Sequence, residues 1–72
     1  MAQYQIHVQT RHHGNYISDL IEVEDIDAEI AIRKDLNANL GKGVLYLEKD
    51  ASTFYFQGKV LKTALVYLKQ IS

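Results

Sequence analysis

One segment, residues 27–40, carries helical signals at both ends and restricts the fold more than any other part of the chain. Apolar residues at intervals of four form a single stripe along it: Ala28, Ile32, Leu36 and Leu40. Asp27 is placed to cap the helix, because its carboxylate can accept a hydrogen bond from a free N–H group of the first turn. Gly41 follows where helices commonly end in a residue with positive φ. We therefore expect a helix with one apolar face that covers a sheet.

The chain before this helix predicts two strands joined as a hairpin. Residues 4–10 alternate between apolar and polar side chains, which is typical of a half-buried strand. Residues 11–15 are polar, contain glycine and predict the hairpin loop. A second strand should run over residues 16–24, where Asp19 falls on the otherwise apolar face. We expect either a β-bulge near Asp19 or an Asp19 that faces inward at a sheet edge.

The chain after the helix also favours extended structure. Residues 44–49 predict a strand that is covered on both faces or central in its sheet, because apolar side chains occur at both odd and even positions. A turn at residues 50–52 leads into a short aromatic strand at residues 53–57. Residues 60–71 fit both a strand and a helix. No Ser, Thr, Asp or Asn stands at their start to cap a helix, so we favour a strand and keep a helix as the alternative.

These segments predict one small α+β domain over residues 1–72, in the order β-β-α-β-β-β. Its antiparallel sheet should have four to five strands, with one helix packed on one face. A chain of this length buries only roughly 60% of the surface that its unfolded form exposes. Oligomerisation is one common support for such a small core.

Composition limits where the domain works and what it can bind. The chain has no cysteine, which excludes disulfides and thiolate metal sites and fits a reducing compartment. No apolar run approaches the ~20 residues that span a bilayer, and the first residues lack the charged start and apolar core of a signal peptide. We expect a soluble cytoplasmic protein with no membrane partner and no cofactor.

The net charge is −1, but it is unevenly distributed along the sequence. Residues 1–41 carry three basic and seven acidic side chains, a net of −4, whereas residues 42–72 carry five basic and two acidic ones, a net of +3. In a single small domain we expect the two halves to interleave in space, so that much of this separation cancels.

Three histidines lie within seven residues, at His7, His12 and His13. Adjacent histidines point apart and rarely bind one ion together, and Arg11 beside them would repel a cation. We therefore expect no metal. A solvated hairpin tip is the first interpretation of this loop, and contact of Arg11, His12 and His13 with an anion is the alternative.

No pattern in the chain predicts catalysis. The Gly-Lys-Gly run at residues 41–43 follows a helix, whereas phosphate-binding glycine loops precede one. There is no nucleophile elbow, and no pair of carboxylates stands in an apolar context. We expect that the protein is not an enzyme.

An aromatic and basic run suggests a nucleic-acid-binding module as a second hypothesis, because stacked aromatics flanked by lysines bind single strands. Tyr55, Lys59 and Lys62 are its candidate contacts. The competing interpretation places Phe54 and Phe56 in the core, which leaves Tyr55 as the only exposed aromatic of the run.

Apolar residues outside the expected core faces give the leading hypothesis. They are Tyr16, Leu20, Ile30 and Tyr46. Contiguous apolar surface of this kind usually marks a protein interface. We therefore expect a small intracellular, non-catalytic protein-binding or self-associating module of the adaptor or inhibitor type, with a protein partner or a homodimer.

Overall fold

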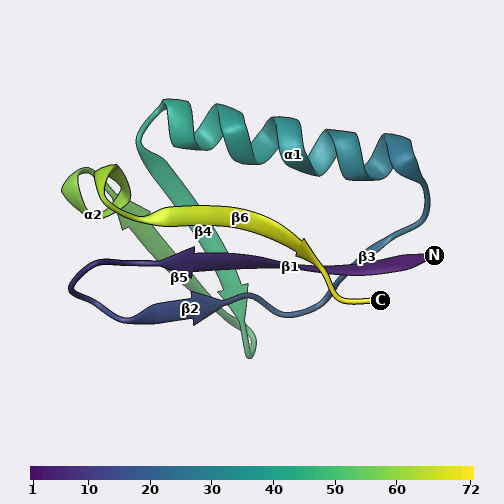
Figure 1. Ribbon diagram of the computed structural model, residues 1–72, viewed down its shortest axis with the longest axis horizontal. Coiled ribbons are helices and arrows are strands. Elements are labelled where there is room, and N and C mark those ends of the chain that lie inside the picture. The colour runs from purple at the N-terminus through teal and green to yellow at the C-terminus, as the bar shows by residue number, and fades with distance from the viewer.

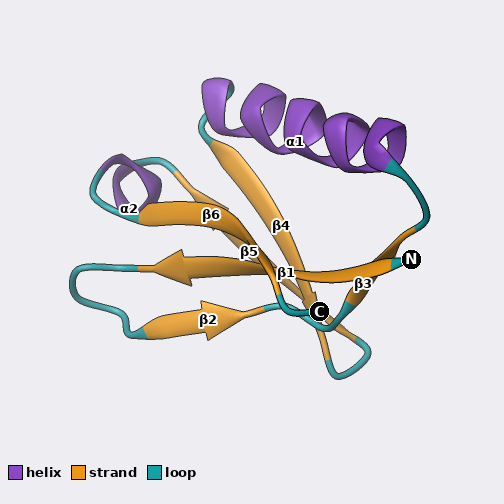
Figure 2. Ribbon diagram, turned by 45° about the vertical axis from the view of Figure 1, so that its right-hand side comes forward, coloured by secondary structure: helices purple, strands orange, loops and turns teal.

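A long helix packs against antiparallel strands in this protein, which a computed structural model describes over residues 1–72 (Figure 1, Figure 2). The elements in chain order are β1 (Ala2–Gln9), β2 (Asn15–Ile17), β3 (Ile21–Val23), α1 (Ile26–Gly41), β4 (Val44–Lys49), β5 (Ser52–Gln57), α2 (Lys59–Lys62) and β6 (Leu65–Gln70). The predicted α+β class, with one main helix on an antiparallel sheet, is confirmed. The strands divide into two sheets, one four-stranded and one a β4–β5 hairpin.

Strand β1 is the centre of the four-stranded sheet. Strand β6 pairs with it along one edge, from Tyr4 opposite Gln70 to Gln9 opposite Leu65. Strands β2 and β3 pair in turn with the two halves of β1, antiparallel to it. Because β6 occupies one edge of β1, β2 and β3 must share the other, as one interrupted strand.

The interruption between β2 and β3 is a β-bulge. His7 pairs with Ile17 and Tyr4 pairs with Ile21, so two residues of β1 face three residues, 18–20, of the other strand. The buried Ser18 fills the gap, because its Oγ accepts a hydrogen bond from the Ile6 amide at 2.8 Å. The predicted bulge near Asp19 is confirmed, whereas an inward Asp19 is wrong because this side chain is exposed.

The bulge exchanges the faces of the strand on either side of it. Tyr16 in β2 turns inward and contacts Phe56, with the ring centroids 5.0 Å apart. Ile17 turns outward and is exposed, whereas Val23 in β3 is buried. The expectation that Tyr16 lies off the core is therefore wrong, because alternation counted across the bulge assigns β2 to the wrong face.

The ends of α1 differ from the predicted ones. Asp25, not Asp27, caps the helix, and its Oδ1 accepts a hydrogen bond from the Ala28 amide at 2.9 Å. Gly41 is the last helical residue, and the positive φ of 75° belongs to Gly43. Both corrections extend the predicted helix to a 16-residue one.

The segment after β5 contains both of the structures that the sequence allows. Lys59–Lys62 form one helical turn after Gly58, whose φ is 62°, and Leu65–Gln70 then form the edge strand β6. The favoured prediction of a strand is thus confirmed for β6, whereas it is wrong for the part of the segment that forms α2. Gly58 starts α2 through its carbonyl oxygen, which accepts hydrogen bonds from the Leu61 and Lys62 amides.

The core forms two adjoining clusters under α1. One contains Val8, Leu36, Leu45, Leu47 and Phe56, and the other contains Tyr4, Val23 and Leu68. The apolar stripe of α1 supplies both clusters, since Ala28 and Ile32 pack on the second and Leu40 on the first. Only nine of the 72 residues are buried, and Phe54, expected in the core, stays 39% exposed. The core of this domain is therefore small.

The two glycines at the end of α1 should respond to alanine in opposite directions. Gly41 has a helical backbone, so Gly41→Ala should stabilise the domain by about 0.5 kcal/mol. Gly43 has a left-handed backbone, so Gly43→Ala should destabilise it by about 1 kcal/mol. Urea denaturation of the two variants and the wild type measures both changes. Midpoints that move in the same direction would show that this helix end is wrongly assigned.

The Ser18 hydroxyl should contribute measurably to stability. Ser18→Ala leaves the Ile6 amide without its partner in the bulge, which should cost about 1–3 kcal/mol in the free energy of unfolding. Ser52→Ala is the matched control, because Ser52 is exposed and should change stability by less than about 0.5 kcal/mol. Equal effects of the two substitutions would contradict the role given to Ser18.

Candidate functional site

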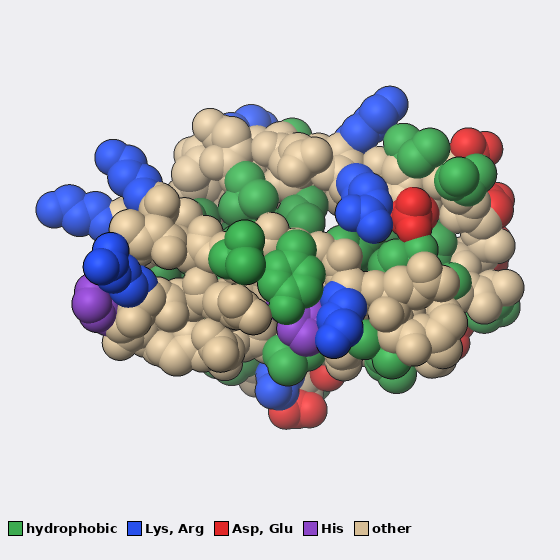
Figure 3. Space-filling view, in the orientation of Figure 1, with side chains coloured by type: hydrophobic (Ala, Val, Ile, Leu, Met, Phe, Trp, Pro, Cys, Tyr) green, Lys and Arg blue, Asp and Glu red, His purple; other side chains and the backbone are tan.

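Basic side chains gather at one end of the molecule. Figure 3 shows Lys and Arg side chains over α2 and the β1–β2 loop, and Asp and Glu side chains over the start of α1 at the other end, which we call the acidic end. Blue side chains also lie beside the red ones over α1 in this view, because Arg33 and Lys34 belong to the helix. The charged halves of the sequence therefore interleave in part.

The acidic end contains the one ion pair of the structure, between Glu29 and Arg33 at 3.7 Å. Glu29 also accepts a hydrogen bond from the Tyr4 hydroxyl, which raises the pKa of Tyr4 because the bond favours its protonated form. A hollow of about 420 Å³ lies beside these groups. Its carboxylates come from Glu24, Asp25 and Glu29, and two of them already act in the helix cap and the ion pair.

The basic end contains a groove of about 270 Å³ between the β1–β2 loop and α2. We call it the basic groove, and it is lined by Thr10, Arg11, His12, His13, Lys59, Val60 and Thr63. Four of the six residues predicted to contact an anion or nucleic acid thus come together. Lys62 lies on the same short helix but lines a different hollow, and Tyr55 lines neither.

A second surface lies on the outer side of the β4–β5 hairpin. Tyr46 and Tyr55 are directly paired across the strands, and their ring centroids are 4.7 Å apart. Leu20 lines the same groove as Tyr46, beside Ile21 and the bulge. We call Leu20, Tyr46 and Tyr55 the hairpin face. Two predicted interface residues therefore meet there, whereas Tyr16 packs inside and Ile30 lies on α1 outside this groove.

The pairing of Tyr46 with Tyr55 follows from a two-residue turn that the sequence signals weakly. Asp50 and Ala51 both have positive φ, at 51° and 62°, as in a type I′ turn. Such turns usually contain asparagine and glycine, so the Asp-Ala pair is only a weak indication of a type I′ turn. A turn assigned to these two residues alone would have predicted the tyrosine pair.

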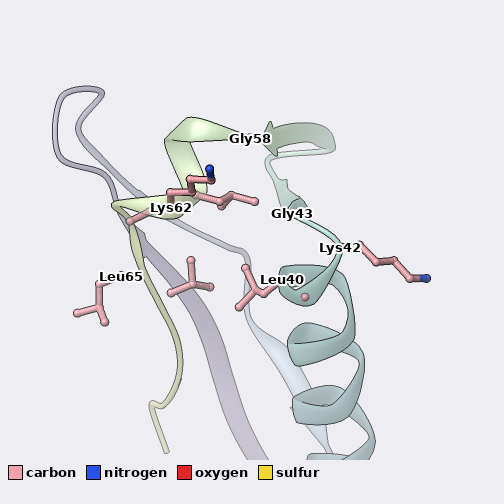
Figure 4. A pocket seen from close by; sticks show the side chains of 10 residues that line it. Leu40, Lys42, Gly43, Gly58, Lys62 and Leu65 are labelled. Atoms are coloured by element: carbon pink, nitrogen blue, oxygen red, sulfur yellow. The ribbon is translucent and has the colours of Figure 1, made fainter.

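The largest hollow, about 560 Å³, lies between the end of α1 and α2 (Figure 4). Its lining includes Leu40, Leu61 and Val66, which also pack against the core. Figure 4 shows Lys42 pointing away from it. Lys62 is the other charged residue in its lining, so the hollow lacks the converging polar groups that mark a ligand site.

The open face of the four-stranded sheet contains a contact that alternation did not suggest. The ring of His7 in β1 stacks on that of Tyr67 in β6, with centroids 5.1 Å apart. The Nε2 atom of His7 is buried and has no hydrogen-bond partner. Exposed Ile17 and Leu65 extend the apolar surface of the two neighbouring strands. Figure 3 shows hydrophobic side chains over the middle of this face.

No three His, Asp or Glu side chains lie close enough together to hold a metal ion. Neither helix combines the length and the apolar character that a bilayer crossing requires.

Comparison with known proteins adds no family to this description. No protein family matches the chain, and no curated protein and no solved structure is significantly similar to it.

Proposed function

We propose that this domain is a non-catalytic protein-binding module that associates with a second copy of itself through the hairpin face. The observation that carries the proposal is the exposure of three adjoining large side chains. Leu20 is 50% exposed, Tyr46 57% and Tyr55 46%. Contiguous apolar surface on a small domain usually marks an interface.

The chemistry of the hairpin face suits a protein partner. Tyrosine is enriched at the centres of protein interfaces, because its rigid ring buries a large area while its hydroxyl keeps a polar contact. The Tyr55 hydroxyl donates a hydrogen bond to Gln57 at 3.0 Å, which helps to hold the ring in place. Asp19 and Glu48 line the groove beside Leu20 and supply a polar rim.

The small core favours a second copy as the occupant. With nine buried residues, the domain gains little stability from its own interior. Apolar surface removed from water at an interface contributes about 25 cal/mol per Å². In a two-fold dimer the same face of both protomers forms the interface, so the tyrosine pair of each protomer would be covered by the hairpin face of the other. The absence of cysteine fits a reducing compartment, and we place the protein in the cytoplasm.

The oligomeric state tests this proposal. Sedimentation equilibrium at tens of micromolar should give the wild type twice its 8.2 kDa protomer mass. Leu20→Lys and Tyr46→Lys each place like charges face to face across the two-fold axis and should weaken the dimer at least about tenfold. High salt should leave the wild-type dimer intact, because its main contacts are apolar.

Leu65→Lys is the matched control. Leu65 is 58% exposed on the open face of the four-stranded sheet, so the same substitution there should leave the dimer unchanged. A wild type that sediments as a protomer throughout would contradict self-association. A dimer that Leu65→Lys splits and Leu20→Lys does not would move the interface away from the hairpin face.

A further inference from the structure

We propose that the basic groove is a phosphate-binding site, separate from the hairpin face. It brings Arg11, His12 and His13 from the β1–β2 loop against Lys59 from α2. Lys59 is 46 or more positions from each of the three loop residues in sequence, so the fold alone brings it beside them. Their side chains are exposed and their nitrogens are available to a ligand in solution.

The wall formed by the loop is held in place by its own hydrogen bonds. The Thr10 amide donates to the Gly14 carbonyl at 3.1 Å, which closes the loop. The Thr10 Oγ1 accepts a hydrogen bond from the His13 amide at 3.0 Å. Gly14 permits the turn, since its φ is 83°. A loop fixed in this way presents its cationic side chains at a lower entropic cost than a flexible one.

The positive charge of the groove is not neutralised within the protein. No Asp or Glu lines it, and the one ion pair of the structure lies at the other end of the molecule. Arg11 and Lys59 are therefore free to bind an anion. The groove shares no lining residue with the hollow at the C-terminal end of α1, where the carbonyl groups of the helix carry partial negative charge.

The size and donors of the groove favour phosphate over other anions. At about 270 Å³ it is smaller than most pockets for whole drug-sized ligands. Cationic donors stand on both of its walls, and Thr63 adds a hydroxyl. A phosphate group presents three strong acceptor oxygens and about two negative charges, so it can contact both walls at once. A planar carboxylate presents two oxygens and one charge. No Phe, Tyr or Trp ring lines the groove, so it lacks the aromatic platform on which the bases of a single strand usually stack.

A titration with inorganic phosphate, followed by the amide signals of the ¹⁵N-labelled protein, tests the proposal. Phosphate should cause saturable shifts at residues 10–13 and 59–63, and acetate at the same ionic strength should not. Arg11→Gln and Lys59→Gln should each weaken phosphate binding about two- to fivefold. Lys34→Gln is the control, because it removes the same charge from the exposed surface of α1 and should have no effect.

Oligonucleotides then identify the source of the phosphate. A single strand with a 5′-phosphate and the same strand without it are compared with free phosphate. Equal binding of both strands, tighter than that of phosphate, assigns the groove to a nucleic-acid backbone. Tighter binding of the phosphorylated strand assigns the groove to a terminal phosphate. If neither strand binds more tightly than free phosphate, the groove is assigned to a small phosphate compound.

The proposal is overturned if phosphate shifts the amide signals no more than acetate does. It is also overturned if Lys34→Gln weakens phosphate binding as much as Arg11→Gln does, or if the shifted signals map to Tyr55.

Discussion

The hydrogen bond from the Ile6 amide to the Ser18 hydroxyl is the contact on which the arrangement of both sheets depends. It supplies an acceptor where the bulge interrupts the ladder between β1 and its neighbour. The Ser18 amide also donates to the Ile6 carbonyl at 2.9 Å, so both backbone groups of Ile6 are satisfied by one residue. The bulge can therefore lie in the interior without leaving a buried polar group unpaired.

The same bulge links the four-stranded sheet to the hairpin. The Asp19 amide donates to the Glu48 carbonyl at 3.0 Å, and the Asp19 Oδ2 accepts from the Asp50 amide at 3.0 Å. These two bonds fix the far end of β4 beside the bulge. They also explain why Leu20, the next residue, lines a groove with Tyr46. Leu20 thus meets Tyr46 of the hairpin face because an extra residue was inserted in a neighbouring strand.

The periodicity of apolar residues within one segment was enough to predict the helix and the first strand. The stripe ending at Leu40 and the alternation around Ile6 each describe one face of one element, and both are correct. The bulge near Asp19 was one of the two arrangements that the sequence allowed, the other being an inward Asp19 at a sheet edge. Residues whose place depends on the bulge were not correctly predicted. Tyr16 was assigned outward because its parity was counted through an inserted residue.

The candidate sites show the same division between local and long-range information. Exposure of Tyr46 could be inferred from its strand, because one residue of an apolar run had to leave the core. Its pairing with Tyr55 required the register of the hairpin. The grouping of Arg11 with Lys59 required the path of the chain over its whole length, and no spacing in the sequence encodes it.

The two surfaces use different chemistry and different elements. The hairpin face is aromatic and formed by β4, β5 and the bulge, and the basic groove is cationic and formed by the β1–β2 loop and α2. No residue belongs to both. The salt dependence of binding should therefore distinguish the two surfaces, because binding of phosphate weakens as ionic strength rises, whereas apolar association does not.

Amide hydrogen exchange at Asp19 reports whether the bulge holds the two sheets together, because that amide joins the bulge to the hairpin. If the bulge locks the two sheets together, the Asp19 amide should exchange as slowly as the amides of the central strand β1, through global unfolding alone. The Asp50 amide, bonded to the Asp19 side chain, should be protected as well. Exchange of both amides at the rate of the His12 amide in the exposed loop would show that the two sheets are not held together at the bulge.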